Sequence, residues 1–288
     1  MRHVYRCPVR WADLDLLGHV NNVVYVDYLQ EARVDFMRAL LPPRAADMTE
    51  GVVVVRHEVG YRAPMGFRFR PVEVECWVTE VRAATFTLGY EVFHEDEGER
   101  TVYVRATTVL TPYVFADERP RRLTADEKTA LGRYLEPEDT PRSRTRTARL
   151  EREDAFRWPL HVRFSDVDAY RHVNNVKYFE YLQESRIRLM ADVTRGHDGV
   201  GRPSIVVAQT DVDYLAPILQ REEPYDVWSQ IARVGTRSMT IESEIADGDR
   251  PLALGRVTVV FFDMETQRSA EPPADLHALL LTRVNAPS

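Results

Sequence analysis

The sequence predicts an α+β protein built from two copies of one unit, each a long central helix wrapped by a curved antiparallel sheet. Three observations predict it: a motif that occurs twice, a long helical pattern after the motif, and a run of strand-like segments after the helix. The chain has 288 residues, 44% of them hydrophobic, which suits two domains that each bury a core.

The repeat is the strongest of these signals. Residues 9–25, VRWADLDLLGHVNNVVY, align with residues 162–178, VRFSDVDAYRHVNNVKY, at an offset of 153, the difference between 9 and 162. The same offset aligns Tyr61 with Tyr214 and Pro64 with Pro217, so no net insertion separates the motifs. The sequence therefore predicts a first domain at 1–136, a linker at 137–156 and a second domain at 157–288. The linker is polar and carries arginines, which are either a solvated surface or a binding patch.

Each copy shows the same order of predicted elements. Apolar residues at spacings of three and four predict a helix over 22–40, with the pair Asn21–Asn22 as its N-terminal cap and Pro42–Pro43 as its end. Segments rich in Val, Thr and aromatic residues predict strands. They lie at 4–10, 52–61, 71–81, 85–93 and 102–112 in the first copy, and at 205–214, 224–234, 238–245 and 252–262 in the second. Turns at 95–98 and 247–249 predict hairpins, and 124–134 predicts a short helix.

Composition narrows the classes of function. The net charge of −7 argues against nucleic-acid binding, which favours a basic excess. Two cysteines, Cys7 and Cys76, are too few for a disulfide scaffold, and no Cys/His spacing predicts a metal site. The sequence shows neither a secretory signal pattern nor an apolar run long enough to span a membrane, so we expect a cytoplasmic protein.

The repeated motif resembles that of the hotdog-fold acyl thioesterases. The resemblance rests on Asp13-x-Asp15-x-x-Gly18-His19-Val20-Asn21-Asn22, with Tyr25 and Glu31 after it. It is closest to the 4-hydroxybenzoyl-CoA thioesterase group and the related acyl-ACP thioesterases, and it implies a tandem double hotdog. It also implies a cytoplasmic enzyme of fatty acid metabolism that hydrolyses an acyl-CoA or acyl carrier protein thioester. Such an enzyme needs no bound cofactor or metal, and we expect no nucleic acid or membrane among its partners. Whether the double-hotdog chain forms homo-oligomers stays open.

The resemblance also implies roles for individual residues. The family's catalytic carboxylate corresponds to Asp15 and Asp168, and its oxyanion donor, a backbone N–H at the start of the central helix, corresponds to Asn22 and Asn175. His19 and His172 match a histidine implicated in the plant-type acyl-ACP enzymes. The asparagine of those enzymes is absent, because its positions hold Leu17 and Tyr170.

The residues support the same chemistry independently. A helix N-terminus offers unpaired N–H groups to a developing oxyanion, and a carboxylate just before it acts either as a nucleophile or as a general base. Each candidate also has a structural alternative: the aspartates as turn residues, the histidines as hydrogen-bonding residues, and Asp13 and Asp166 as anchors of the loop to Arg10 and Arg163. Further candidates for substrate binding are Gly18, Tyr25, Tyr178, Glu31 and Glu184.

Alternatives for these further candidates also remain. The tyrosines suit a core or a pocket wall, and the glutamates suit either a buried pair with an arginine or the positioning of water. Arginines that could bind the anionic thiol carrier are Arg62, Arg68, Arg70, Arg82, Arg233 and Arg237, for each of which surface solvation is the alternative.

Two rival functions and two structural expectations complete the predictions. The rivals are a hotdog hydratase or dehydratase, and a non-catalytic module that binds acyl thioesters or carrier proteins. We expect the two halves to share one antiparallel sheet, since each half alone would leave a sheet edge open. We also expect the Asp15 site to be the stronger, because Arg171 in the second copy replaces Gly18 of the first.

Overall fold

The computed structural model describes residues 1–40, 50–137, 147–197, 204–263, 265–266 and 268–284. It divides into two compact units, Met1–Thr145 and Arg146–Ser288. The predicted helix end at Pro42–Pro43 and residues 138–146 of the predicted linker lie outside the described residues. None of the helices in the described ranges is both long enough and apolar enough to cross a membrane.

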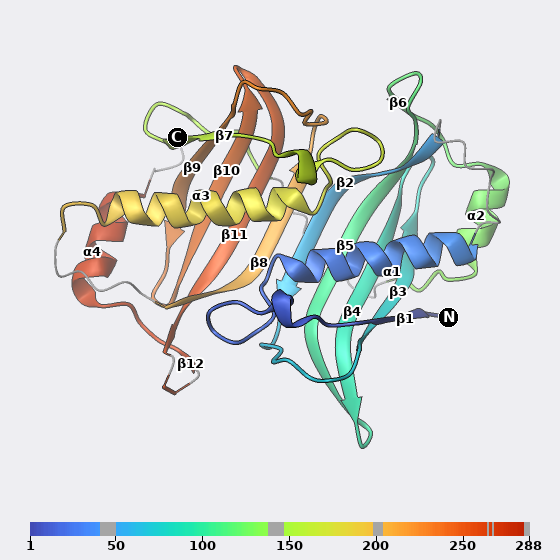
Figure 1. The fold of residues 1–288 in the computed structure, drawn as a ribbon, viewed down its shortest axis with the longest axis horizontal. Coiled ribbons are helices and arrows are strands. Elements are labelled where there is room, and N and C mark those ends of the chain that lie inside the picture. The colour runs from blue at the N-terminus through green and yellow to red at the C-terminus, as the bar shows by residue number, and fades with distance from the viewer. Residues whose placement is uncertain (41–49, 138–146, 198–203, 264, 267, 285–288) are drawn as a thin grey trace. The chain divides into compact units, whose positions relative to one another are not determined.

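The first unit is an antiparallel sheet with one long helix across a face of it (Figure 1). The strands follow the order β1-β3-β4-β5-β2, and α1 packs against β1 and β3. The elements are β1 (His3–Cys7), the 3-10 helix η1 (Trp11–Asp13), α1 (Val24–Leu40), β2 (Glu50–Tyr61), β3 (Val72–Val81), β4 (Phe86–Asp96), β5 (Glu99–Val114), β6 (Arg119–Pro120) and α2 (Ala125–Gly132).

The second unit repeats this plan. Its strands follow the order β7-β9-β10-β11-β8, all antiparallel, and α3 packs against β7, β9 and β10. The elements are β7 (Phe156–Leu160), the 3-10 helix η2 (Phe164–Asp166), α3 (Lys177–Val193), β8 (Ile205–Tyr214), β9 (Tyr225–Val234), β10 (Ser238–Asp247), β11 (Arg250–Asp263), β12 (Arg268–Ser269) and α4 (Ala274–Thr282). The predicted strand order along the chain and both hairpin turns are confirmed, with ends that shift by a few residues.

The core of the first unit lies between α1 and the sheet. Val26, Leu29, Ala32 and Phe36 are fully buried on one face of α1, at the spacings that predicted the helix. Phe36 also packs edge-on against Tyr134, with ring centroids 4.9 Å apart. Burial of this stripe fixes the direction of α1, and therefore the place of its N-terminus, where the predicted active site lies.

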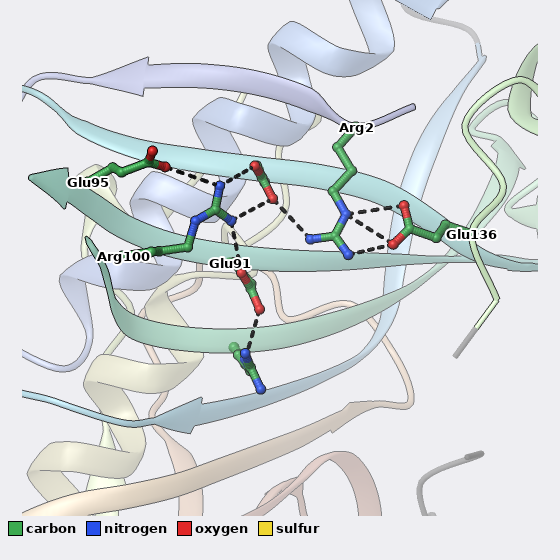
Figure 2. Close-up of polar contacts among 7 residues, drawn as sticks. Arg2, Glu91, Glu95, Arg100 and Glu136 are labelled. Carbon is green, nitrogen blue, oxygen red and sulfur yellow. Dashed lines mark hydrogen bonds and ion pairs between the residues drawn. The ribbon is translucent and has the colours of Figure 1, made fainter. Parts of the chain in front are cut away.

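The opposite face of this sheet carries a network of ion pairs (Figure 2). Arg100 lies 2.8 Å from the Glu75 carboxylate and 3.2 Å from that of Glu91. Arg2 joins Glu75 at 3.0 Å and Glu136 at 2.5 Å, so the segment after α2 is tied to the first residues of the chain. Alternation along β3 and β4 separates this charged face from the apolar core.

The beginning of the second unit lies against its own sheet. Glu244 on β10 is fully buried and accepts from the backbone N–H of Leu150 at 3.1 Å. Its carboxylate also binds Arg149 at 3.2 Å and Arg152 at 2.6 Å. Residues 149–152, in the C-terminal part of the predicted linker, are therefore held by a specific set of contacts.

Candidate active site

A short hairpin carries the catalytic motif into α1. In the first unit the Asp15 N–H donates to the His19 carbonyl at 2.8 Å, and the Asn21 N–H donates to the Asp13 carbonyl at 2.8 Å. The second unit repeats both bonds, from Asp168 to His172 at 2.9 Å and from Asn174 to Asp166 at 2.8 Å. This hairpin holds Asp15 in register with the residues that begin the helix.

The turn of this hairpin needs a left-handed backbone. Gly18 adopts φ = +75°, which glycine does without strain. Arg171, its counterpart, adopts φ = +64°, an unusual conformation for a residue with a side chain. Arg171 therefore preserves the loop backbone. Among the ion pairs of the described residues, none joins Arg171 to Asp168.

The Asp15 carboxylate is half-buried and held by one of its two oxygens. Oδ1 accepts from the Leu17 N–H at 2.8 Å and from the His19 N–H at 3.4 Å. Among the described residues, none donates a hydrogen bond to Oδ2. In the second unit the Asp168 Oδ1 accepts from the Tyr170 N–H at 2.9 Å. These bonds orient the carboxylate and leave lone pairs on Asp15 for chemistry.

The entry into α1 leaves one backbone donor available. The Asn21 side chain accepts from the Val23 N–H at 3.2 Å, and the Val24 N–H donates to the Asn21 carbonyl at 3.0 Å. The Asn22 N–H finds no acceptor among the described residues, while its carbonyl accepts from the Tyr61 hydroxyl at 2.8 Å. The asparagine pair thus caps a turn that precedes the helix, so α1 begins at Val24, two residues later than predicted.

The second unit begins its helix with the same contacts. The Val176 N–H donates to the Asn174 side chain at 3.2 Å, and the Tyr214 hydroxyl donates to the Asn175 carbonyl at 2.8 Å. Asn22 and Asn175 therefore occupy equivalent places in the two units.

Asp13 anchors the loop to Arg10, as the sequence predicted. Its carboxylate is buried and accepts from the Tyr28 hydroxyl at 2.7 Å, the Arg10 N–H at 2.7 Å and the Arg10 side chain at 2.9 Å. Burial alone would raise the pKa of Asp13, but the hydrogen bonds from Tyr28 and Arg10 outweigh it and lower the pKa. Asp166 has matching bonds from the Tyr181 hydroxyl at 2.8 Å and the Arg163 N–H at 2.9 Å.

The remaining motif residues divide between the loop and the core. His19 pairs with Gly66 in a β-bridge, and its half-buried imidazole makes no hydrogen bond within the described part of the chain. His172 is half-buried at the equivalent place. Tyr25 and Tyr178 are buried in the two cores, where burial raises the pKa of both phenols.

The structure corrects the reading of Glu31 as one of a buried ion pair. Glu31 is exposed and Glu184 is half-buried, because both lie off the apolar stripes of their helices. The buried charges are Arg33 and Arg186, two residues farther along. Glu31 is therefore not part of a buried pair with an arginine, which was one of its two readings. The other reading, that the two glutamates position water, stays a prediction.

The candidate anion-binding arginines lie on the surface. Arg68 and Arg70 both bind Asp96, at 2.6 and 2.5 Å, and Arg82 binds Glu80 at 2.8 Å. Arg62, Arg233 and Arg237 are exposed. In the described ranges no group of His, Cys, Asp and Glu side chains could hold a metal ion.

Sequence reasoning missed two tyrosine contacts that shape the site. Tyr28 and Tyr181 bind the loop aspartates, and Tyr61 and Tyr214 bind the helix-entry asparagines. All four recur at the repeat offset, together with the residues that they bind. The sequence did contain a signal for these contacts, because each tyrosine and the residue that it binds occur in both copies of the repeat.

Comparisons with known proteins agree with this architecture. The chain is 34% identical over 98 residues to a proposed esterase of Aquifex aeolicus (strain VF5), a match that covers 33% of this chain and 76% of that protein. The 12:0-ACP thioesterase of Umbellularia californica has a similar structure, with a TM-score of 0.73 and 14% identity over 90% of this chain and 93% of that one. A proposed oleoyl thioesterase of Lactobacillus plantarum matches with a TM-score of 0.71 and 16% identity, over 90% and 94% of the two chains.

The comparison with protein families covers both copies of the motif. The family model described as the thioesterase-like superfamily matches residues 9–129 and again residues 162–280. The two matched segments contain both hairpins and both long helices. The chain therefore belongs to the thioesterase-like superfamily, carries the family domain twice and is a thioester hydrolase.

Proposed function

We propose that the chain hydrolyses an acyl thioester of coenzyme A or of acyl carrier protein to a free acid and a thiol. Asp15 is the catalytic carboxylate, and the Asn22 backbone N–H binds the oxyanion. One observation carries the proposal: a carboxylate oxygen and a backbone N–H, both without partners among the described residues, lie on the segment that leads into α1.

The helix supplies the electrostatic part of the mechanism. α1 has 17 residues, and the positive end of its dipole faces the loop that carries Asn22. A donor that is already oriented stabilises the negative oxygen of the tetrahedral intermediate without rearrangement during the reaction. Tyr61 holds the Asn22 carbonyl, and so fixes the plane of the peptide unit that follows the donor.

Asp15 supplies the proton transfer or the attack. As a general base, Oδ2 takes a proton from water while the water oxygen bonds to the carbonyl carbon; the carbon–sulfur bond then breaks, and the thiolate leaves with a proton. As a nucleophile, Oδ2 bonds to that carbon, the thiolate leaves, and water hydrolyses the mixed anhydride. A single turnover in ¹⁸O-labelled water, with enzyme in excess, detects the nucleophilic route when water attacks the Asp15 carbon of the anhydride, because label then enters the Asp15 carboxylate. Trapping of the anhydride with hydroxylamine, which leaves a hydroxamate of the acyl group or of Asp15, detects this route whichever carbon water attacks.

Gly18 supplies open space at the turn. A Cβ atom at this position would meet no atom within 4 Å apart from those of Gly18 and its two chain neighbours, so the space beside the Gly18 backbone is available to a substrate. His19, Tyr25 and Tyr178 are proposed to shape the substrate sites of the two units. The hydrolysis is proposed to be cytoplasmic and to need no bound cofactor.

The two sites are proposed to be unequal, with the Asp15 site the stronger. In the second unit Tyr170 and Arg171 place two large exposed side chains on the turn where the first unit has Leu17 and Gly18. Asp15→Asn keeps the shape of the side chain and removes its charge, so we expect hydrolysis to fall on the order of 10²–10⁴-fold. We expect Asp168→Asn to lose little, with circular dichroism used to check the folding of both variants. The reverse order would contradict the assignment, and full activity in the double variant would overturn the carboxylate mechanism.

Thiol release from a panel of alkyl and aryl acyl-CoAs and acyl carrier proteins tests the reaction itself. Release detected with a thiol reagent supports hydrolysis. Binding of the same thioesters without any release would favour a non-catalytic module. Consumption or formation of a carbon–carbon double bond with the thioester left intact would favour a hydratase or dehydratase.

A further inference from the structure

Three aromatic rings form a cluster at the surface of the first unit. Trp11 comes from η1, and Phe67 and Phe69 come from the loop between β2 and β3. The rings meet edge to face, with centroids 5.4 Å apart between Trp11 and Phe67 and 5.0 Å apart between Phe67 and Phe69. Trp11 is 73% exposed and Phe69 is 98% exposed. These three residues, termed the aromatic lip, leave large apolar surfaces open to solvent, which in a folded protein indicates a binding surface.

The aromatic lip adjoins the catalytic hairpin on both sides. Trp11 precedes the loop anchor Asp13 by two residues. The Val20 N–H donates to the Met65 carbonyl at 2.8 Å, and His19 forms a β-bridge with Gly66, the residue before Phe67. The ring-bearing loop is therefore fastened to the hairpin that holds Asp15. The aromatic lip therefore lies next to the hairpin that carries Asp15, where a ligand bound at Asp15 can contact it.

Two arginines alternate with the rings, in the order Phe67-Arg68-Phe69-Arg70. Each binds Asp96 of the β4–β5 hairpin through one nitrogen, and their side chains remain 44% and 41% exposed. A guanidinium carries five N–H donors, so one bond to Asp96 orients each arginine and leaves further donors directed at solvent. Exposed aromatic faces beside oriented guanidinium groups are a combination that binds a nucleotide, whose base stacks and whose phosphates accept charged hydrogen bonds.

We propose that the aromatic lip, with Arg68 and Arg70, binds the nucleotide end of coenzyme A. Adenine stacks on the exposed rings, and phosphate oxygens accept from the two arginines. The inference rests on the proposed thioester hydrolysis and deepens it by naming the thiol carrier. An acyl carrier protein offers no base to stack.

The second unit does not repeat this surface. At the repeat offset Phe67 and Phe69 become Gln220 and Glu222, and Arg70 becomes Glu223. The remaining arginine, Arg221, binds Asp247 through two nitrogens, at 2.9 and 2.8 Å. Phe164, the counterpart of Trp11, is 84% exposed without an aromatic neighbour from that loop. The nucleotide site therefore belongs to the first unit, and Phe164 provides a matched control.

The test measures how strongly the enzyme prefers a CoA thioester to a pantetheine thioester of the same acid. Pantetheine ends before the nucleotide. The KM for the pantetheine thioester divided by the KM for the CoA thioester therefore reports on the nucleotide contact. Because stacking of a base on an aromatic ring contributes about 1–3 kcal/mol, we expect Trp11→Ala and Phe69→Ala each to reduce this ratio on the order of 10-fold. Phe164→Ala, with an equally exposed ring removed, should keep the ratio of the parent protein.

Calorimetric titration of the intact protein with free coenzyme A gives a readout that needs no catalysis. We expect Trp11→Ala, Phe69→Ala and Arg68→Gln to weaken binding on the order of 10-fold, and Phe164→Ala to retain it. Equal affinity of all variants for coenzyme A would overturn the nucleotide site. A rise in KM for an acyl carrier protein thioester in the lip variants, with the CoA ratio retained, would overturn it in favour of protein docking. Failure to hydrolyse any thioester, with intact binding of coenzyme A to the lip, would refute the proposed function and leave the nucleotide site standing.

Discussion

Gly18 and Arg171 show how one residue position affects the two units differently. Both adopt a left-handed backbone at the same turn, and that conformation costs a residue with a side chain about 1 kcal/mol. Arg171→Gly should therefore stabilise the second unit by about 1 kcal/mol, and Gly18→Ala should destabilise the first by a similar amount. Calorimetric unfolding measures both changes. A lower stability of Arg171→Gly would show that the arginine side chain contributes more than the strain of the turn.

Tyr28 affects the site through the buried carboxylate of Asp13. Removing its hydroxyl in Tyr28→Phe leaves a buried charged acceptor with one hydrogen bond fewer, which should cost about 1–3 kcal/mol near neutral pH. Tyr113→Phe is the control, since the structure gives the Tyr113 hydroxyl no hydrogen bond in the described ranges. Urea denaturation of the two variants and the parent protein measures the difference. Equal loss in both variants would contradict a specific bond to Asp13.

The same carboxylate predicts a dependence on pH. Because the pKa of Asp13 is lower in the folded protein than in the unfolded chain, its contribution to stability is complete above the unfolded value, near ~3.9. This contribution is lost as the pH falls toward the lowered folded value. The destabilisation caused by Tyr28→Phe should therefore shrink under acid conditions, where Asp13 is protonated in both proteins. A penalty that stays constant down to low pH would contradict this linkage.

At the scale of elements, Glu244 joins the start of the second unit to β10. The carboxylate is fully buried and compensated by Arg149, Arg152 and the Leu150 N–H. Removing the charge of Glu244 leaves the positive charges of Arg149 and Arg152 without their partner. Glu244→Gln should therefore destabilise the second unit by about 3 kcal/mol. Hydrogen exchange at the Leu150 amide should accelerate with it. Glu242→Gln is the control, because Glu242 lies 3.7 Å from Arg256 in a more exposed pair that should contribute below about 1 kcal/mol.

Local signals explain which elements the sequence could predict. Alternation in β4 and β5 and the Gly98 turn place the hairpin between these two strands, since the pleat and the left-handed turn are properties of neighbouring residues. The start of α1 was placed two residues early because an asparagine before a helix also caps a preceding turn, and both uses have the same sequence signature. The contact of Leu150 with Glu244 joins residues 94 apart in the chain, so no local pattern announces it.

The same distinction applies to the candidate site. Asp15, Asn22 and Gly18 could be predicted because the motif is contiguous and occurs twice. The rotation of α1 about its axis decides that Arg33 is buried while Glu31 is exposed, and this rotation depends on the packing of Phe36 and Leu29 against the sheet. The aromatic lip joins η1 to the loop after β2, and this proximity exists only in the folded unit.

At the scale of the whole molecule, the repeat predicts that neither unit is complete alone. The sheet of the first unit, taken by itself, ends in β1, of 5 residues, and in β2, of 12 residues, which contains the run Val52–Val55. A long apolar edge strand exposes unpaired backbone groups and pairs readily with another strand. We therefore expect residues 1–145 expressed alone to form a homodimer or to aggregate. Size-exclusion chromatography with light scattering, over a range of concentrations, measures this. A first unit that stays monomeric and soluble at high concentration would contradict this prediction, because its long edge would then be stable without a partner strand.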